Sequence, residues 1–423
     1  MELEQFRTAL GFSREFTEKI APHWAYLLEH SSGDFPSFME ESFYREYYPL
    51  CAGPAEEIMY PRMAEVARIV RENPAVARYA SILFFVNFFA PDSILGLGWE
   101  SPEALFGKNI GIFHLMVAMA ALPEIRKVHA EMGLPDTFMK GVANWISGAI
   151  TTYIDGHNGE PGFNMSQIYW VGFTLKKKLF RFGRLEFYPR SYTEDLPPVY
   201  RHRKTGRLAV FCRDGWAFDE KGLRVDPQWK TPSFTASFRV SGDTVTGTPV
   251  AADGLPVRGK EISITLPEWE PLCTAWDNVM TMHIPGGGGM TLESVRDSLI
   301  QAREFYKKYF NLEIKLFTCQ SWILNPAWQD ELPGSNMAKL QRNAYLTPAC
   351  IADGGNPGLF FIYGDRKCDP FQRPQTTSLH KAVCRILARG EYLRSGCLIL
   401  PADQVEQIGT EYFRNEYSAS KLV

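Results

Sequence analysis

The chain has 423 residues, with 45 lysines and arginines against 48 aspartates and glutamates, and a formal net charge of −3. At roughly 100–200 residues per domain, this length predicts two or three domains and is long enough to bury a core. The 29 Phe, 18 Tyr and 10 Trp residues exclude a disordered chain. The slightly acidic balance excludes general nucleic-acid binding by charge, because neutralising phosphates requires a surplus of Lys and Arg.

Neither a secretory signal nor a membrane span is expected. The first six residues, Met-Glu-Leu-Glu-Gln-Phe, contain neither a basic region nor an apolar core. The most apolar stretches, Tyr79–Ala90 and Gly111–Leu122, are shorter than the roughly 20 residues that a span needs. The eight cysteines are scattered without a CxxC pair, which favours reduced thiols in a cytoplasmic protein. No His or Cys cluster has metal-ligand spacing, so we expect no structural metal.

Residues 1–178 are expected to form an all-helical domain. Apolar residues recur there at helical spacing, and no strong period-two run interrupts them. Pro74 suits the first turn of a helix, and Ser101-Pro102-Glu103 has the order of an N-cap and first turn. The expected helices are Glu2–Ile20, Ala55–Glu72, Ala75–Phe89, Asn109–Ala120, Leu122–Glu131 and Pro135–Tyr153.

Residues 179–423 are expected to form an α/β domain with a mixed sheet and added β-hairpins. Short alternating or β-branched runs are separated there by Gly-Asp, Asp-Gly and Lys-Gly pairs. The expected strands are Phe180–Tyr188, Arg207–Phe211, Ser233–Val240, Thr244–Pro249, Glu261–Leu266, Asn278–Ile284, Ile314–Cys319, Leu359–Tyr363 and Cys397–Leu400. The expected helices are Thr291–Phe310, Pro326–Leu332 and Ser378–Ala388. Their alternation with strands favours the α/β class.

The most informative segment contains a run of four glycines, residues 286–289, between a strand and the helix that begins at Thr291. Glycines let backbone N–H groups approach a phosphate, and a helix N-terminus adds partial positive charge. The segment contains neither the Gly-Lys-Ser/Thr of a Walker A loop nor a GxGxxG pattern with a later acidic residue. Two interpretations remain: an anion cradle, or a plain connector that needs positive φ.

Four short blocks of the sequence carry a family resemblance. They are Phe180–Phe187, His283–Gly287, Cys319–Pro326 and Ser335-Asn336. Together with their spacing they resemble a bacterial two-domain family described as acyltransferases. That family has a helical N-terminal domain and a C-terminal domain similar to the GNAT superfamily of acyl-CoA N-acyltransferases.

The resemblance implies that Met280–Ile284 is the central GNAT strand and that Thr291–Phe310 is the helix after it. In that superfamily the turn between them binds the pyrophosphate of coenzyme A through backbone amides. The implied cofactor-binding residues are Gly286, Gly287, Gly288, Gly289, Met290 and Thr291, and the implied co-substrate is acetyl-CoA or another acyl-CoA. The turn departs from the usual Gln/Arg-x-x-Gly-x-Gly/Ala, because no Gln or Arg begins it and Pro285 lacks an amide donor.

Acyl transfer to an amine requires a base for the ammonium proton, a group that stabilises the oxyanion and an acid for the leaving thiolate. His283 is the natural base candidate, because it ends the strand beside the glycines; a buried structural histidine is the alternative. Glu186 is either a second base, an ammonium ligand or the partner of Arg184 in a structural pair. Cys319 is either a small core residue or a nucleophile paired with His283.

Three functional hypotheses follow. The first is an acyl-CoA-dependent N-acyltransferase with a small-molecule acyl donor and an amine acceptor. The second is a non-catalytic ligand- or protein-binding module on a GNAT-like scaffold that has lost coenzyme A binding, which Pro285 and the absent Gln/Arg favour. The third is a Cys–His hydrolase, which requires the Cys319 and His283 side chains to meet.

Overall fold

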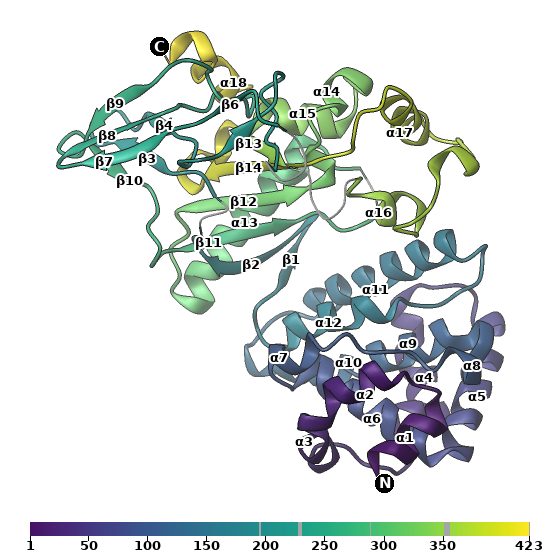
Figure 1. Cartoon of the computed structure of the whole chain (residues 1–423). Helices are drawn as coiled ribbons and strands as arrows, with labels where there is room; N and C mark the ends of the chain where they lie inside the picture. The colour runs from purple at the N-terminus through teal and green to yellow at the C-terminus, as the bar shows by residue number, and fades with distance from the viewer. Residues whose placement is uncertain (194–195, 227–230, 288, 351–355, 423) are drawn as a thin grey trace. The chain divides into compact units, whose positions relative to one another are not determined.

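The structure, a computed structural model, describes residues 1–193, 196–226, 231–287, 289–350 and 356–422. Its contacts divide the chain into two units, Met1–Arg181 and Phe182–Val423. The first unit is helical and the second is built around a mixed sheet (Figure 1). An all-α region followed by an α/β region is the order that the sequence predicts.

The helices of the first unit follow one another with short connections. They are α1 (Leu3–Leu10), α2 (Arg14–Ile20), α3 (Trp24–Glu29), α4 (Glu41–Tyr47), α5 (Glu56–Glu72), α6 (Pro74–Phe88), α7 (Asp92–Leu95), α8 (Glu103–Phe106), α9 (Ile110–Met119), α10 (Leu122–Glu131), α11 (Thr137–Gly156) and α12 (Ile168–Leu175). The single helix expected over residues 2–20 is wrong. Gly11 ends α1 with a φ of 72°, and the Ser13 hydroxyl accepts from the N–H of Phe16 to begin α2.

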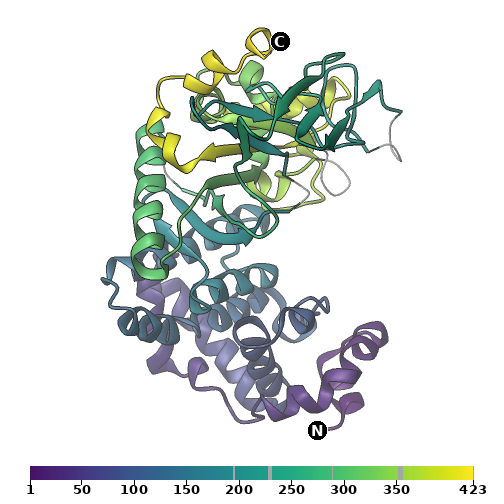
Figure 2. The ribbon, with the colours of Figure 1, turned by 90° about the vertical axis from the view of Figure 1, so that its left-hand side faces the viewer.

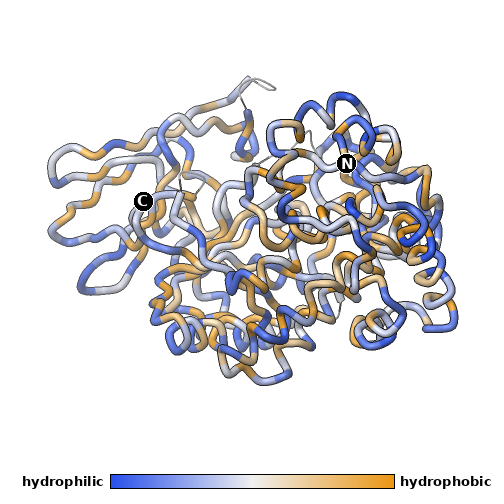
Figure 3. Tube along the Cα trace, turned by 90° about the horizontal axis from the view of Figure 1, so that it is seen from below, coloured by the Kyte–Doolittle hydropathy of each residue, from blue (hydrophilic) through white to orange (hydrophobic). Residues whose placement is uncertain are grey.

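Two strongly buried helices, α6 and α9, form part of the core of the helical unit. Pro74 occupies the first turn of α6, as expected, and the Asn73 side chain caps it by accepting from the N–H of Ala75 at 3.0 Å. The segment Glu103–Glu131, which contains α9, is long and apolar enough to cross a membrane, but 72% of its most apolar window is buried inside the structure. Such burial is typical of core helices in a folded domain. Hydrophobic stretches recur along the chain in Figure 3.

The second unit has one large sheet and several small ones. Its strands, the first of which begins just before the unit, are β1 (Phe180–Phe182), β2 (Leu185–Ser191), β3 (Val199–His202), β4 (Leu208–Val210), β5 (Ala217–Phe218), β6 (Phe234–Thr235), β7 (Phe238–Ser241), β8 (Thr244–Gly247), β9 (Ile262–Thr265), β10 (Trp269–Pro271), β11 (Asn278–His283), β12 (Leu316–Ser321), β13 (Tyr345–Cys350) and β14 (Ser395–Pro401). Its helices are α13 (Leu292–Phe310), α14 (Trp328–Glu331), α15 (Asn336–Asn343), α16 (Leu359–Tyr363), α17 (Ser378–Ala388) and α18 (Tyr412–Glu416).

The large sheet has the order β1-β2-β11-β12-β14-β13. β11 and β12 run parallel, whereas β2 with β11, β12 with β14, and β13 with β14 run antiparallel, so the sheet is mixed as predicted. β2 and β11 are neighbours in the sheet, yet residues 192–277 separate them in sequence. The described part of that insertion forms the small sheets β10-β3-β4, β5-β6 and β7-β8-β9, where the sequence predicts hairpins.

The strand predicted at Leu359–Tyr363 is wrong, because these residues form the short helix α16. Gly358 and Gly364 bound the helix with φ values of 99° and 74°, conformations that favour glycine. Leu359 and Tyr363, four residues apart, are the buried side chains of this turn. The apolar run therefore buries one side of a single helical turn, a pattern too short to distinguish from a strand by sequence.

The strand of the large sheet that the sequence analysis missed is β13, which forms an edge of that sheet; the short strands β3, β5 and β10 of the small sheets were also missed. β13 contains Pro348, which lacks the N–H that a regular ladder requires. The pairing of β13 with β14 shifts register between Thr347 and Cys350. Proline is found at such edges and irregularities, so its presence is compatible with the strand.

Helix α13 covers one face of the large sheet and runs along it as the long green helix of Figure 2. The Tyr306 hydroxyl donates to the carbonyl of Phe187 at 2.7 Å, and the rings of Phe305 and Phe182 lie 4.9 Å apart. Phe187 and Phe317, from β2 and β12, also pack together at 5.7 Å between ring centroids. This face of the sheet is therefore apolar and belongs to the core.

Candidate functional site

The opposite face of the sheet carries a group of polar side chains from three neighbouring strands. In the antiparallel register of β2 and β11, Glu186 lies opposite His283, and Tyr188 lies opposite Thr281. In the parallel register of β11 and β12, Thr318 lies beside Thr281. Paired residues point to the same face of a sheet. We call these five residues the polar face.

Glu186 and His283 are brought together by the register of β2 and β11. Side chains directly opposite each other on antiparallel strands have Cβ atoms about 4.5–5.5 Å apart. The Glu186 side chain is buried, and the half-buried His283 ring stacks on Tyr188 with centroids 5.2 Å apart and planes 13° apart. Burial, and secondly the positive charge of Arg190, lower the pKa of His283 to about 4. The imidazole is therefore neutral at pH 7.

Thr281 and Thr318 are functional candidates that the sequence analysis missed. Both hydroxyl oxygens are buried, and within the described residues neither has a hydrogen-bond partner. The Thr318 side chain belongs to a residue that is only 2% exposed. A buried hydroxyl without a partner costs about 1–3 kcal/mol, so a polar group from a ligand or water would stabilise it. The available signal was a threonine directly between two apolar residues in each of these strands.

The two central strands part near this polar face. β11 and β12 pair only at Met280 with Phe317 and at Thr281 with Thr318, although β11 continues to His283 and β12 to Ser321. Over these last residues β11 remains paired with β2, and β12 remains paired with β14. The pairing of β11 with β12 thus ends before the C-terminal ends of both strands. The glycine run follows a few residues after the end of β11.

The glycine run connects β11 to the capped N-terminus of α13. The Thr291 hydroxyl accepts from the N–H of Ser294 at 3.2 Å, so Thr291 is the N-cap of α13. Gly287 has a φ of 94°, a conformation that side chains disfavour. A Cβ added to Gly286 or Gly287 would meet no atom within 4 Å, so this side of the loop faces open space. Gly288 lies outside the described residues.

The rest of the loop lies close to a second helix N-terminus. A Cβ added to Gly289 would lie 3.8 Å from the amide nitrogen of the Asn336 side chain, in the first turn of α15. Ser335 caps α15 by accepting from the N–H of Ala338 at 3.1 Å. The Met290 side chain is buried and anchors the loop in the unit. Partial positive charge from both helix ends therefore lies near the glycines.

Arg184 approaches the glycine run from the turn between β1 and β2. Its guanidinium Nη2 donates to the carbonyl of Gly287 at 3.2 Å, and its backbone N–H donates to the Ser298 hydroxyl at 3.1 Å. Ser298 belongs to α13, so the hairpin turn is fixed against that helix. The structure thus places a guanidinium beside a loop whose own sequence lacks the usual Gln or Arg.

Cys319 and His283 do not meet. Because Thr318 shares the face of Thr281, the next residue, Cys319, points to the opposite, α13-covered face. Cys319 is buried there, and burial raises the pKa of its thiol. The Cys–His pair of the third hypothesis therefore does not form, and Cys319 occupies the position of a core residue. No group of three His, Cys, Asp or Glu side chains able to hold a metal is present among the described residues.

A helical unit followed by a mixed sheet with a strand–glycine loop–helix junction defines a two-domain protein with a GNAT-like C-terminal half. The family described as GNAT-like C-terminal domain matches residues 179–400, more than half of the sequence, and this chain belongs to it. The resemblance found in the sequence is thereby confirmed. A search of curated proteins finds no match.

Solved structures share the fold along nearly the whole chain. One is an acyltransferase in complex with decanoyl-CoA and teicoplanin, 19% identical, with a TM-score of 0.62 over 95% of this chain and 100% of that one. Another is a mutant acyltransferase in complex with octanoyl-CoA, 19% identical, with a TM-score of 0.63 over 95% of this chain and 99% of that one. A third, with CoA and 10C-teicoplanin, is 19% identical and has a TM-score of 0.62 over 95% of this chain and 100% of that one.

Proposed function

We propose that this protein is an acyl-CoA-dependent N-acyltransferase that transfers an acyl group from a coenzyme A thioester to an amine. The observation that carries the proposal is the junction of β11, the glycine run and α13. It combines glycine backbone facing open space, a capped helix N-terminus and the guanidinium of Arg184. Proteins of the same fold have been crystallised with acyl-CoA, which supports the proposal.

The glycine run is suited to the pyrophosphate of coenzyme A. Backbone N–H groups without side chains in front of them, together with a helix N-terminus, form a general anion site. Gly286, Gly287 and Gly289 are exposed, and Thr291 begins the helix. In this assignment Arg184 supplies a positive charge that also holds the loop through the Gly287 carbonyl. Pro285 removes one donor at the start of the loop and leaves the following glycine amides.

The polar face provides groups for the proposed transfer. The amine nitrogen attacks the thioester carbonyl carbon, so that a C–N bond forms and the C–S bond breaks. The departing thiolate of coenzyme A takes up a proton from the imidazolium that forms when His283 accepts the ammonium proton, which returns the base to its neutral form. The neutral His283 accepts the ammonium proton, and the carboxylate of Glu186 on the neighbouring strand stabilises the resulting imidazolium. Direct attack on the thioester fits the position of Cys319 on the opposite face.

Gly286 provides a sharp test of the cradle. Its φ is not positive and its Cβ position is open, so a side chain fits there without backbone strain. Gly286→Glu adds a negative charge beside the phosphates, and Gly286→Gln adds a side chain of nearly the same size without the charge. We expect Gly286→Glu to weaken binding of CoA and decanoyl-CoA at least about tenfold, because like charges close to each other at a protein surface repel by a few kcal/mol. Gly286→Gln should weaken it much less.

Isothermal titration calorimetry and thermal shift with CoA, acetyl-CoA and decanoyl-CoA measure these affinities. Micromolar binding by the wild type, followed by amine-dependent release of free CoA thiol, would support the proposal. Equal affinities of Gly286→Glu and Gly286→Gln would contradict the cradle. No heat and no shift at millimolar CoA would overturn the acyltransferase assignment and favour the non-catalytic binding module.

A further inference from the structure

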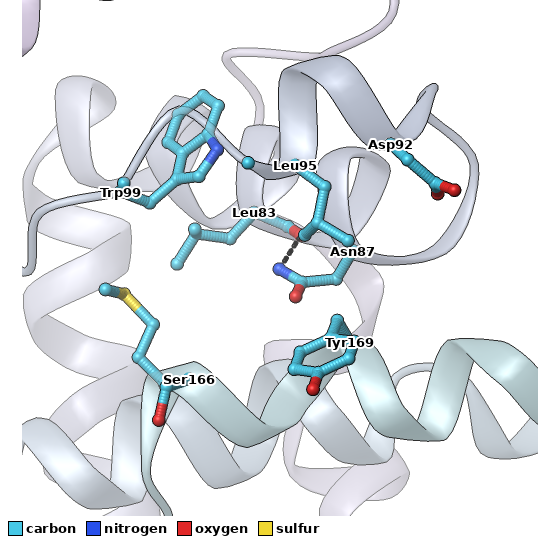
Figure 4. A pocket seen from close by; sticks show the side chains of 10 residues that line it. Leu83, Asn87, Asp92, Leu95, Trp99, Ser166 and Tyr169 are labelled. Atoms are coloured by element: carbon cyan, nitrogen blue, oxygen red, sulfur yellow. Dashed lines mark hydrogen bonds between the residues drawn. The ribbon is translucent and has the colours of Figure 1, made fainter. Parts of the chain in front are cut away.

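The helical unit contains a pocket of about 450 Å³. Helices α6, α7 and α12 and the segments beside them form its walls (Figure 4). All of its lining residues belong to the first unit, whereas the glycine run belongs to the second. The volume lies within the range of about 300–1,000 Å³ that is usual for small-molecule sites.

The walls of the pocket are mainly apolar, with two aromatic rings and a thioether. The large apolar side chains are Leu83, Leu95, Trp99, Met165 and Tyr169. The indole N–H of Trp99 donates to the carbonyl of Ile94 at 3.0 Å, which fixes the ring and occupies its only polar atom. Aromatic faces and a methionine sulfur make favourable contacts with an aromatic ring.

Asn87 places a fixed hydrogen-bond acceptor among mainly apolar side chains, and Asp92 and Ser166 are further polar lining residues. Asn87 lies on α6 and is only 5% exposed. Its Nδ2 donates to the carbonyl of Leu83 at 2.7 Å, which sets the orientation of the amide, since a flipped amide would bring two oxygens together. The Oδ1 atom consequently faces the pocket (Figure 4). A ligand that fills the pocket must present an O–H or N–H group to Oδ1. A carboxylate of a ligand would be repelled by this oxygen, because both groups are hydrogen-bond acceptors.

We propose that this pocket binds an aromatic molecule carrying one O–H or N–H donor. Its ring contacts Trp99 and Tyr169, and its donor bonds to Asn87 Oδ1. An alkyl chain would fill the same volume with fewer ring contacts. A molecule without a donor would cover Oδ1 and leave that oxygen without a hydrogen bond, which would weaken its binding. The proposal does not depend on acyl transfer, because binding is measured without CoA.

The test compares matched probes by calorimetry on the full chain. 2-Naphthol carries a ring and a donor, 2-methoxynaphthalene has the same ring without the donor, and 1-decanol has a donor on an alkyl chain. We expect 2-naphthol to bind about 3- to 10-fold more tightly than 2-methoxynaphthalene, the range that a single neutral hydrogen bond provides. It should also bind more tightly than 1-decanol.

Three variants locate the binding. Asn87→Leu should abolish the preference for 2-naphthol over 2-methoxynaphthalene while leaving the ring contacts. Leu95 is half-buried, and Leu95→Phe narrows the pocket, so it should weaken the binding of 2-naphthol several-fold. Leu105→Phe, on α8 outside the lining, is the control and should leave affinity unchanged. Absent binding at 1 mM, an unchanged preference in Asn87→Leu, or tighter binding of 1-decanol would overturn the proposal.

Discussion

His283 has the chemical state that a general base requires, but its conjugate acid is strong. Burial lowers its pKa to about 4, so the ring is neutral above that pH and is protonated only below it. Neutral imidazole accepts a proton readily only if the product cation is stabilised. In the proposed mechanism, the carboxylate of Glu186, opposite His283 in the register, supplies this stabilisation.

The pH dependence of the proposed activity follows from this state. Protonation of His283 removes the base, so kcat/KM should fall only as pH approaches about 4, whereas an unperturbed histidine would lose activity below about 6.5. His283→Asn should lower kcat by about 10²–10⁴-fold with a smaller change in KM. Profiles of kcat/KM between pH 4 and 8 show where activity falls on the acid side. A wild-type limb near 6.5, or full activity of His283→Asn, would show that another group is the base.

The unpartnered hydroxyl of Thr318 gives a stability prediction. Thr318→Val keeps the shape of the side chain and removes a buried oxygen that has no partner within the described residues. We expect the free energy of unfolding to rise by about 1 kcal/mol. The matched control is Thr17→Val, because the Thr17 hydroxyl donates to the carbonyl of Ser13 at 2.8 Å and its loss should lower stability by about 1 kcal/mol. Urea unfolding measures both; a loss of stability in Thr318→Val would mean that the hydroxyl is bonded in solution.

At the scale of elements, local chemistry made α13 and its surroundings predictable. Thr291 is a residue type that is preferred at N-caps, and the helix after it has a clear apolar stripe. The glycines before it interrupt regular structure. α17 was predicted with its observed bounds for the same kind of reason. β13 was missed because its place in the sheet depends on pairing with β14, a contact that Pro348 makes less evident in sequence.

The candidate site was only partly predictable for a related reason. The glycine run and its helix cap are contiguous in sequence, so their chemistry could be read directly. The meeting of Glu186 with His283 depends on the pairing of β2 with β11 across residues 192–277. Arg184 reaches the loop through the β1–β2 turn, and Cys319 faces away because of its strand register. Register is a property of the folded sheet and is weakly encoded in any single strand.

Close approach of β14 to the turn after β12 gives the prediction at this scale. A Cβ on Gly396 would lie 1.9 Å from the carbonyl oxygen of Leu324, so Gly396→Ala forces backbone apart. We expect it to lower the free energy of unfolding by about 3 kcal/mol. Gly148→Ala, inside α11 with no atom within 4 Å of the new Cβ, should instead raise it by about 0.5–1 kcal/mol. Urea melts of both variants test the pair, and tolerance of Gly396→Ala would contradict the packing of β14.

At the scale of the whole molecule, the described chain divides its features between two units. The polar face and the glycine run belong to the second unit, and the aromatic-lined pocket belongs to the first. The helical core also contains His114 and His129, both buried. Burial lowers the pKa of each to about 4, and for His114 a bond to the carbonyl of Phe163 partly opposes the shift. The stability of the first unit should therefore depend on pH.

The direction of that dependence is set by which state binds more protons. Below about pH 6.5 the unfolded chain protonates these histidines, whereas the folded unit keeps them neutral down to about pH 4. The contribution of these histidines to the free energy of unfolding is therefore complete above pH 6.5. Below that pH it falls by about 1.4 kcal/mol per pH unit for each histidine. His129 isolates this effect, because neither ring nitrogen has a partner within the described residues. His129→Leu should remove its share of the slope without breaking a hydrogen bond.

We expect wild type to lose about 2 kcal/mol more than His129→Leu between pH 6.5 and pH 5, since one histidine titrates over that 1.5-unit interval in the unfolded chain alone. Urea unfolding followed by far-UV circular dichroism at several pH values gives both slopes. Titrating carboxylates contribute equally to the two proteins and cancel in the difference. His30 is exposed, so His30→Gln is the control for the loss of a histidine that is not buried. Identical slopes for wild type and His129→Leu would show that His129 is solvated or paired in solution, and a steeper slope for His129→Leu would reverse the sign argued here.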